Sequence, residues 1–368
     1  MPSRRLRVLV LTPDFLPTPG GIQLLMHRLV THFERCEATV ITVAAEDAES
    51  FDEDQVVRII RTPRNERLGG ATTIGLLNAA AVANGVRLRP DAVLSGHIAV
   101  APAARVLKQA MRIPYLQYLY GREIVMRPRM ADLGIHHAAA IVVISRYTQQ
   151  LAAEHGANRC RVHLIPPGID VPAVNGTARI RERGTIVCVS RLDERYKGQD
   201  VLIRAMPLVR ARADHARLLL VGDGPRRGAY ERLVESVGAA EYVSFLGRLT
   251  DDGRDHVLSH ADLFAMPSRL STVGAEGFGI VFIEAGANGL PVVAGAVAGT
   301  LDAVVDGETG ILVDPNDHVA VADALSELLA DPSRARALGR AGAARAQQFA
   351  WPLVARRVED VLLQIARQ

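Results

Sequence analysis

Short, continuous runs of apolar residues alternate along this chain with longer segments in which apolar residues recur every three to four positions. Such runs are typical of strands buried on both faces of a parallel sheet, and the longer spacing is typical of helices with one buried face. In the first half, strands are expected at residues 8–11, 40–44, 56–60, 92–95, 114–120, 138–145 and 162–165. Helices are expected at residues 22–33, 71–88, 99–111 and 146–155. The alternation predicts a doubly wound α/β domain.

The same alternation starts again at residue 185. Strands are expected at residues 185–189, 218–221, 243–247, 263–268, 291–294 and 310–314, and helices at 199–211, 319–329, 334–349 and 351–368. The turn Pro166-Pro167-Gly168 and the polar, aperiodic residues 171–184 are typical of a boundary between domains. Two domains are therefore predicted, residues 1–172 and 173–351, and 368 residues are enough for both to have full cores.

Composition narrows the functional classes. Hydrophobic residues make up 49% of the chain and charged residues 23%, as in soluble globular proteins. Aromatic residues make up only 4%, which argues against a nucleic-acid partner bound by base stacking. The net charge of +3 is consistent with phosphate-bearing ligands. Three cysteines without a CxxC pair indicate reduced thiols in a cytoplasmic protein, and no apolar run reaches transmembrane length. The eleven histidines show no metal-ligand spacing, so no metal site is expected.

Residues 275–290, AEGFGIVFIEAGANGL, contain the densest candidate chemistry. Glu276 is predicted in a loop that opens into a helix, and Glu284 one or two turns inside it. Gly277 and Gly279 on either side of Phe278 let the backbone approach a ligand, and the free N–H groups of a helix start attract oxygen-rich groups. Two carboxylates suit a ligand with many hydroxyls. The alternative is a capped helix with two solvated acids.

Two further loops follow predicted strands. Gly20 and Gly21 follow the first strand, where ligands bind in α/β folds, but GxGxxG is absent. Arg191 and Lys197 share one strand-to-helix loop, which is well placed to neutralise a diphosphate; a basic surface loop is the alternative.

A third glycine-rich segment, residues 222–228, is similar to a nucleotide loop. Pro225 removes a donor that a phosphate cradle would use, so a tight turn against the nucleotide is the better interpretation. Asp251-Asp252-Gly253 is interpreted as an exposed turn rather than a metal motif.

Six motifs together resemble a known family: PDFLPTPGGIQ, IPPGID, SRLDERYKGQDVLIRAMP, LVGDGP, FLGR and EGFGIVFIEAGANGLPVVAG. The chain is similar over nearly its whole length to retaining glycosyltransferases of family 4, and within them to actinobacterial mannosyltransferases that build phosphatidylinositol mannosides from GDP-mannose. The resemblance implies the GT-B architecture, in which two Rossmann-like domains face each other across an interdomain cleft.

The resemblance also implies roles for single residues. Arg191 and Lys197 would bind the donor diphosphate and stabilise the leaving nucleotide, and Glu276 would hold sugar hydroxyls together with the backbone of the next three residues. Glu284 would hold the ribose and Arg248 would flank the base. Gly20 and Gly21 would face the diphosphate from the first domain, onto which the C-terminal helix, residues 352–368, would cross back. No cofactor, metal ion or protein nucleophile would be needed.

One position departs from the family pattern. Tyr120 stands where the family carries a histidine that meets the donor sugar, so a UDP- or dTDP-sugar is an alternative donor. His97 is a second candidate for contact with donor sugar or acceptor, with a structural role as its alternative.

The acceptor is left open between a lipid, a glycan and a small molecule. Two basic stretches favour either peripheral contact with the inner face of a membrane or simple solvated charge. They contain Arg58, Arg61, Arg64 and Arg67 in one and Arg127 and Arg129 in the other.

Three rival functions stay open: a nucleotide-sugar epimerase or phosphorylase of the same fold, a non-catalytic nucleotide-sugar binder, and an NAD(P) dehydrogenase. The missing fingerprint after the first strand argues against the last of these.

Overall fold

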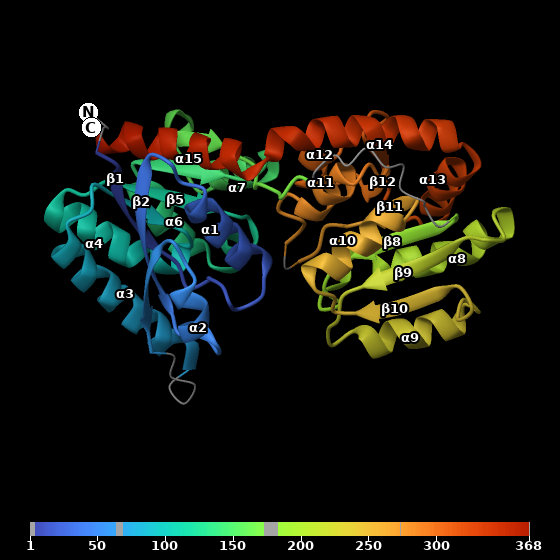
Figure 1. Cartoon of the computed structure of the whole chain (residues 1–368), viewed down its shortest axis with the longest axis horizontal. Coiled ribbons are helices and arrows are strands. Elements are labelled where there is room, and N and C mark those ends of the chain that lie inside the picture. Colours follow the sequence, from blue (N-terminus) through green and yellow to red (C-terminus); the bar gives the residue numbers. More distant parts are fainter. Residues whose placement is uncertain (1–3, 64–68, 173–182, 273, 368) are drawn as a thin grey trace. The chain divides into compact units, whose positions relative to one another are not determined.

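A computed structural model describes residues 4–63, 69–172, 183–272 and 274–367. The chain divides into two compact units (Figure 1). Unit 1 comprises Met1–Gly168 with Trp351–Gln368, and unit 2 comprises Ile169–Ala350. The chain therefore leaves unit 1 directly after the Pro-Pro-Gly turn. Most of the expected linker falls on residues 173–182, outside the described part of the chain.

Unit 1 contains a parallel sheet of seven strands in the order β3-β2-β1-β4-β5-β6-β7. The strands are β1 (Leu6–Leu11), β2 (Cys36–Val43), β3 (Arg58–Thr62), β4 (Ala92–Ser95), β5 (Tyr115–Leu119), β6 (Ala140–Val143) and β7 (Val162–Leu164). The helices are α1 (Gly21–Thr31), α2 (Ala48–Glu53), α3 (Gly69–Leu88), α4 (Ala101–Met111), α5 (Arg122–Met126), α6 (Pro128–His137), α7 (Arg146–Glu154) and α15 (Trp351–Ala366), with short 3₁₀ turns η1 (Ile98–Val100) and η2 (Arg159–Arg161).

The continuous apolar runs form the central strands because both faces of this sheet are covered. Leu9, Val93, Tyr115 and Ile141 are all buried in one core together with side chains of α3, α4 and α6. The strand order reverses between β1 and β4, which pair in parallel. In open α/β sheets, ligands bind beyond the carboxyl ends of the strands at such a reversal.

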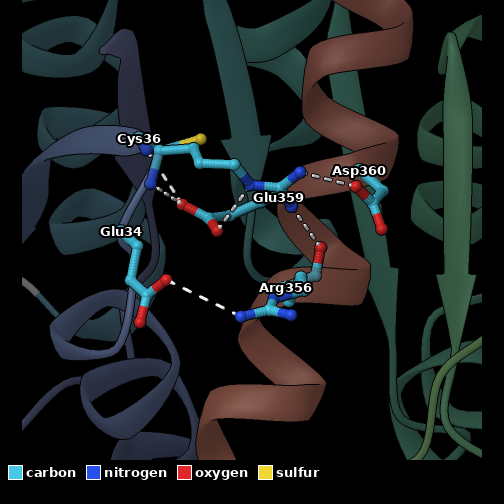
Figure 2. A network of polar contacts seen from close by, with 6 residues as sticks. Glu34, Cys36, Arg356, Glu359 and Asp360 are labelled. Carbon is cyan, nitrogen blue, oxygen red and sulfur yellow. Dashed lines mark hydrogen bonds and ion pairs between the residues drawn. The ribbon is translucent and has the colours of Figure 1, made fainter. Parts of the chain in front are cut away.

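The C-terminal helix α15 is tied to unit 1 by a buried carboxylate (Figures 1 and 2). Glu359, 1% exposed, accepts hydrogen bonds from the backbone N–H groups of Arg35 at 2.6 Å and Cys36 at 2.9 Å. The Arg35 guanidinium adds contacts to Glu359 at 3.2 Å and to Asp360 at 2.8 Å. A buried carboxylate is stable only when it is paired and hydrogen-bonded, and this network meets both conditions.

Unit 2 contains a parallel sheet of six strands in the order β10-β9-β8-β11-β12-β13, with its reversal between β8 and β11. The strands are β8 (Thr185–Val189), β9 (Arg217–Val221), β10 (Val243–Gly247), β11 (Leu263–Met266), β12 (Val292–Gly295) and β13 (Gly310–Val313). The helices are α8 (Gln199–Arg212), α9 (Arg227–Ser236), α10 (Asp251–His260), α11 (Ile280–Ala287), α12 (Thr300–Ala303), α13 (His318–Ala330) and α14 (Pro332–Ala346), with 3₁₀ turns η3 (Arg195–Lys197) and η4 (Gln347–Phe349).

The expectation of an exposed turn at Asp251-Asp252-Gly253 is wrong, because these residues begin helix α10. The Thr250 hydroxyl accepts a hydrogen bond from the Gly253 N–H at 3.2 Å, as an N-cap does, and two aspartates in the first turn favour the positive end of the helix dipole. Acidic residues that are typical of turns are thus also typical of helix starts. Within the described residues, no helix is both long and apolar enough to cross a bilayer.

Candidate functional site

The loops that follow β8 and β11 come together at the carboxyl edge of the unit 2 sheet. Lys197 lies on the first loop and Glu276 on the second, and the Lys197 Nζ is 2.5 Å from the Glu276 Oε2. These are the two strands between which the strand order reverses. The sequence placed both residues in the candidate site, and the structure joins them in one ion pair.

This pair is largely shielded from water, since the two side chains are 13% and 14% exposed. Burial lowers the pKa of Lys197, but the adjacent Glu276 carboxylate, together with Tyr196, more than offsets this, and the pKa lies above its ordinary value. Lys197 is therefore a fixed positive charge at neutral pH. Lysine is also rare in this arginine-rich chain, which contains only Lys108 and Lys197.

The loop that carries Lys197 is held to the loop after β11. Gly198 has a φ of +78°, and a Cβ there would lie 2.0 Å from the carbonyl oxygen of Pro267. The Asp200 carboxylate binds Arg269 at 2.8 Å and Arg195 at 2.9 Å, one guanidinium from each loop. Glycine at 198 and this charge network therefore fix the position of the Lys197 ammonium.

Glu276 is positioned by its backbone. The Gly299 N–H donates to the Glu276 carbonyl oxygen at 3.0 Å, and a Cβ at Gly299 would lie 2.1 Å from the carbonyl oxygen of Gly277. Phe278 is buried, and Gly279 turns the chain into α11 with a φ of +92°. The tight approach of these two loops leaves the Glu276 carboxylate facing Lys197.

Glu284 lies in the second turn of α11, as predicted, but forms a separate pair. Its Oε1 is 3.8 Å from Arg254 Nη2 on α10. Burial raises the pKa of Glu284, and the Arg254 guanidinium offsets part of this effect. Arg254 was not predicted as a site residue, because the residues that begin α10 are also typical of an exposed turn.

The two other predicted cations of unit 2 are on the surface. The Arg191 side chain is 65% exposed, with its guanidinium 3.2 Å from Asp193. Arg248, directly after β10, is exposed. Both lie near carboxyl ends of strands, where a ligand can reach them.

The loop after β9 packs against the loop that holds Arg191. A Cβ on Gly222 would lie 2.0 Å from the Ser190 carbonyl oxygen, and a Cβ on Gly224 would lie 2.6 Å from that of Leu192. These glycines are required by the close approach of two backbones. The segment is a tight turn, as predicted, and its contact with a nucleotide stays a prediction.

Unit 1 has a cavity of about 830 Å³, lined by loops that follow β1, β2, β4 and β5. Its polar and charged lining comprises Asp14, Thr18, Gln23, Thr73, His97, Arg122, Glu123 and Arg127. Burial raises the pKa of Asp14 and that of Glu123. These two acids were not singled out from the sequence, since nothing in their spacing marks them.

His97 faces this cavity as a neutral ring. Its Nδ1 accepts a hydrogen bond from the Ala99 N–H at 3.0 Å, which leaves the proton on Nε2. Burial, with a further contribution from Arg127, lowers the pKa of His97 to about 4. The side chain thus has a structural role through Nδ1 and also lines the cavity.

Tyr120 is largely buried, and its contact with a donor sugar or acceptor stays a prediction. It is 7% exposed, its hydroxyl donates to the Gly96 carbonyl oxygen at 2.9 Å, and its ring stacks on Tyr118. The hydroxyl is therefore used within the protein. Its backbone N–H donates to Glu123 Oε1 at 2.6 Å, so Tyr120 helps to position a residue that lines the cavity.

Gly20 and Gly21 precede and begin α1, and their neighbours Thr18, Ile22 and Gln23 line the same cavity. A Cβ on Gly21 would meet no atom within 4 Å. Contact with a donor stays a prediction for both glycines.

The first basic stretch contributes less surface charge than the sequence suggested. Arg61 is 10% exposed, binds Asp52 at 2.8 Å and donates to the Leu16 carbonyl oxygen. Arg64 and Arg67 lie outside the described residues. Over the part of the chain that is described, no three His, Cys, Asp or Glu side chains are grouped as metal ligands.

Comparison with family models matches residues 19–172 to "Glycosyltransferase Family 4" and residues 183–331 to "Glycosyl transferases group 1". A GDP-mannose-dependent alpha-(1-6)-phosphatidylinositol monomannoside mannosyltransferase of Mycobacterium tuberculosis H37Rv is 33% identical, covering 97% of this chain and 98% of the relative. Its monoacylated-acceptor counterpart in Corynebacterium glutamicum is 34% identical over 97% of both chains.

Among solved structures, Anabaena HepE in complex with UDP-glucose superposes with a TM-score of 0.79 over 98% of this chain and 100% of its own, at 20% identity. That likeness, with the two parallel sheets, confirms the predicted GT-B class of two Rossmann-like domains. The extent of the sequence matches shows that this chain is a glycosyltransferase and belongs to glycosyltransferase family 4.

Proposed function

We propose that this glycosyltransferase moves mannose from GDP-mannose to a lipid-linked acceptor, with retention of configuration and without a metal ion or cofactor. The relatives from M. tuberculosis and C. glutamicum are named for GDP-mannose as donor and a phosphatidylinositol monomannoside as acceptor. The chain matches both over nearly their full length. Similarity of this extent supports the same donor and the same class of acceptor.

The observation that carries the proposal is the largely shielded Lys197–Glu276 pair, on the loops that follow β8 and β11. When the bond between the anomeric carbon and the diphosphate breaks, negative charge grows on the β-phosphate. Lys197 meets that charge as a compact ammonium and Arg191 as a forked donor, in place of a metal ion. Both are held on one loop, so little reorganisation is needed at the moment of reaction.

Carboxylates bind the hydroxyls of the donor. Glu276 accepts hydrogen bonds from the hexose, supported by backbone N–H groups of Gly277, Phe278 and Gly279. Glu284 accepts from the ribose, and Arg248 flanks the base. The acids thus contact different parts of one donor rather than acting as a glycosidase pair.

The acceptor hydroxyl attacks the face from which the nucleotide departs. Its oxygen bonds to the anomeric carbon as the bond from that carbon to the phosphate oxygen breaks. The leaving phosphate takes the hydroxyl proton, so no protein nucleophile is required.

The cavity of unit 1 suits an acceptor that carries hydroxyls and a phosphate. Asp14, Glu123 and the neutral His97 ring offer hydrogen-bond partners to hydroxyls, and Arg127 offers a positive charge to a phosphate.

Purified protein assayed with GDP-mannose, UDP-glucose and dTDP-glucose tests the donor, and the anomeric signal of the product tests retention. Transfer from GDP-mannose that is insensitive to EDTA is expected. Lys197→Ala should abolish it, whereas Arg212→Ala, which breaks another 2.5 Å ion pair of the same unit with Asp323, should not. Exclusive use of another nucleotide sugar, or full activity of Lys197→Ala, contradicts the proposal.

A further inference from the structure

We propose that a cavity of about 550 Å³ at the amino edge of the unit 2 sheet is a binding site for a small organic phosphate with an apolar body. The cavity lies where β8, β9 and β11 begin, beside α13 and α14. The Lys197–Glu276 pair lies at the carboxyl edge of the same sheet, so roughly 15 Å of strand separates the two places. The site is therefore additional to the proposed donor site.

Positive charge dominates the lining of this cavity. Among its described lining residues there are three exposed arginines and one acid. The arginines are Arg183, Arg336 and Arg340. The acid is Asp262, whose Oδ2 accepts the backbone N–H of Gly184 at 2.6 Å. The guanidinium groups outnumber this one carboxylate, so the cavity favours an anionic ligand.

Helix α14 holds two of these arginines together. Arg336 and Arg340 are four residues apart, so their side chains are neighbours on one face, and a like-charge pair at this spacing destabilises a helix. Within Pro332–Ala346, all of which the structure describes, there are four arginines and no acid. Arg336 donates to the Ser333 hydroxyl at 3.3 Å, which is a neutral partner. A phosphate bound by Arg336 and Arg340 would remove their repulsion and accept forked hydrogen bonds.

Much of the remaining lining is apolar. Leu263 and Leu328 are buried, and Leu329, Ala335 and Ala343 are half-buried. Small-molecule sites are typically cavities of about 300–1,000 Å³ with a mainly apolar lining and a few charged groups that orient the ligand. Apolar side chains beside guanidinium groups thus select an organic phosphate over the free phosphate ion.

Close backbone contacts hold the walls of the cavity in place. A Cβ on Gly339 of α14 would lie 2.1 Å from the carbonyl oxygen of Gly289, which lines the cavity. Gly184 has a φ of +81°, and a Cβ there would lie 2.6 Å from Cδ2 of His215, another lining residue. The cavity is therefore preformed, and a ligand does not have to order these walls when it binds.

The test is calorimetric titration of the whole protein with naphthyl phosphate and, in separate titrations, with inorganic phosphate and with neutral naphthol. The variant is Arg340→Glu. The matched control is Arg232→Glu, because Arg232 is also an exposed helical arginine of unit 2 but is not a lining residue. Lys197→Ala is included because the proposed donor site could also bind a phosphate.

Naphthyl phosphate should bind wild type, Arg232→Glu and Lys197→Ala with equal affinity, and Arg340→Glu at least about tenfold more weakly. Inorganic phosphate and naphthol should each bind wild type at least about tenfold more weakly than naphthyl phosphate does.

Five results would overturn the proposal: no binding by wild type, undiminished binding by Arg340→Glu, an equal loss in Arg232→Glu, a loss in Lys197→Ala, or equal affinity for inorganic phosphate or naphthol. A loss in Lys197→Ala would assign the probe to the donor site instead. Because no sugar nucleotide is present, failure of this assay is distinct from failure of the proposed function. Unchanged thermal melting of the variants verifies folding.

Discussion

Replacing Lys197 with alanine removes the positive half of an ion pair whose members are each less than one-sixth exposed. Glu276 then faces the donor diphosphate as an uncompensated negative charge. Replacing Glu276 with alanine instead leaves the ammonium in place but removes the acceptor for sugar hydroxyls. The double variant removes both charges, so a cycle of the four proteins isolates the energy of the pair.

The exposure of the two side chains sets the expected coupling energy between Lys197 and Glu276. Exposed ion pairs couple by about 0.2–1 kcal/mol, whereas breaking a buried pair costs about 3–5 kcal/mol. The Lys197–Glu276 pair is mostly shielded, so a coupling of about 2–3 kcal/mol is expected. Removing a cation that stabilises charge in the transition state costs a further factor of about 10²–10³ in kcat. We therefore expect Lys197→Ala to lose about 10³-fold or more in kcat/KM.

The assay is initial-rate transfer from GDP-mannose for wild type, both single variants and the double variant, with Arg212→Ala as the control for loss of an ion pair in the same unit. The double variant should lose less than the product of the single losses. Additive losses, with coupling below about 0.5 kcal/mol, would mean that the two residues act independently, and the reasoning from their 2.5 Å contact would be refuted.

Three further predictions concern single side chains. Burial raises the pKa of Glu284, so its ionised carboxylate destabilises the folded protein at pH 7. Glu284→Gln should therefore raise the melting temperature at pH 7 by about 2–4 °C, and this gain should disappear as pH falls below about 4.3, where the carboxyl is protonated in both the folded and the unfolded state. The same variant should weaken donor binding, measured by calorimetry. An unchanged melting temperature of Glu284→Gln at pH 7 would contradict this prediction. Cys160 is the exposed thiol among three free cysteines, so Ellman's reagent should titrate one fast thiol per native chain, and two or three fast thiols would contradict the burial of the others. Glu359→Ala leaves the N–H groups of Arg35 and Cys36 without their acceptor and should lower the free energy of unfolding of unit 1 by about 2–3 kcal/mol, measured in urea. Glu359→Gln keeps an acceptor oxygen and should lower it less. Equal decreases for the two variants would show that hydrogen bonding is not the cause.

The strands could be predicted because their apolar runs are a local property of the sequence. Residues 185–189 and 243–247 were expected as strands and are strands with those bounds. Glycines such as Gly279 could also be placed, because their need for positive φ or close approach recurs in loops that precede helices.

Contacts between distant elements could not be predicted in the same way. The pairing of Glu284 with Arg254 depends on α10, whose acidic start is equally typical of a turn. The burial of Glu123 and the partial burial of Asp14 depend on how four loops converge, which no spacing in one segment encodes. Likewise, the hydroxyl of Tyr120 is satisfied by the carbonyl of Gly96, a neighbour only in the folded sheet.

Because the chain contains only two lysines, selective ¹³C-lysine labelling gives one signal for Lys197 and one for Lys108, assigned with the corresponding arginine variants. Titration with GDP-mannose, followed by NMR, observes the proposed diphosphate ligand directly. We predict that the Lys197 Cε signal shifts in proportion to donor occupancy while that of Lys108 stays in place. A saturating donor that leaves Lys197 unmoved would contradict the assignment of this ammonium to the leaving nucleotide.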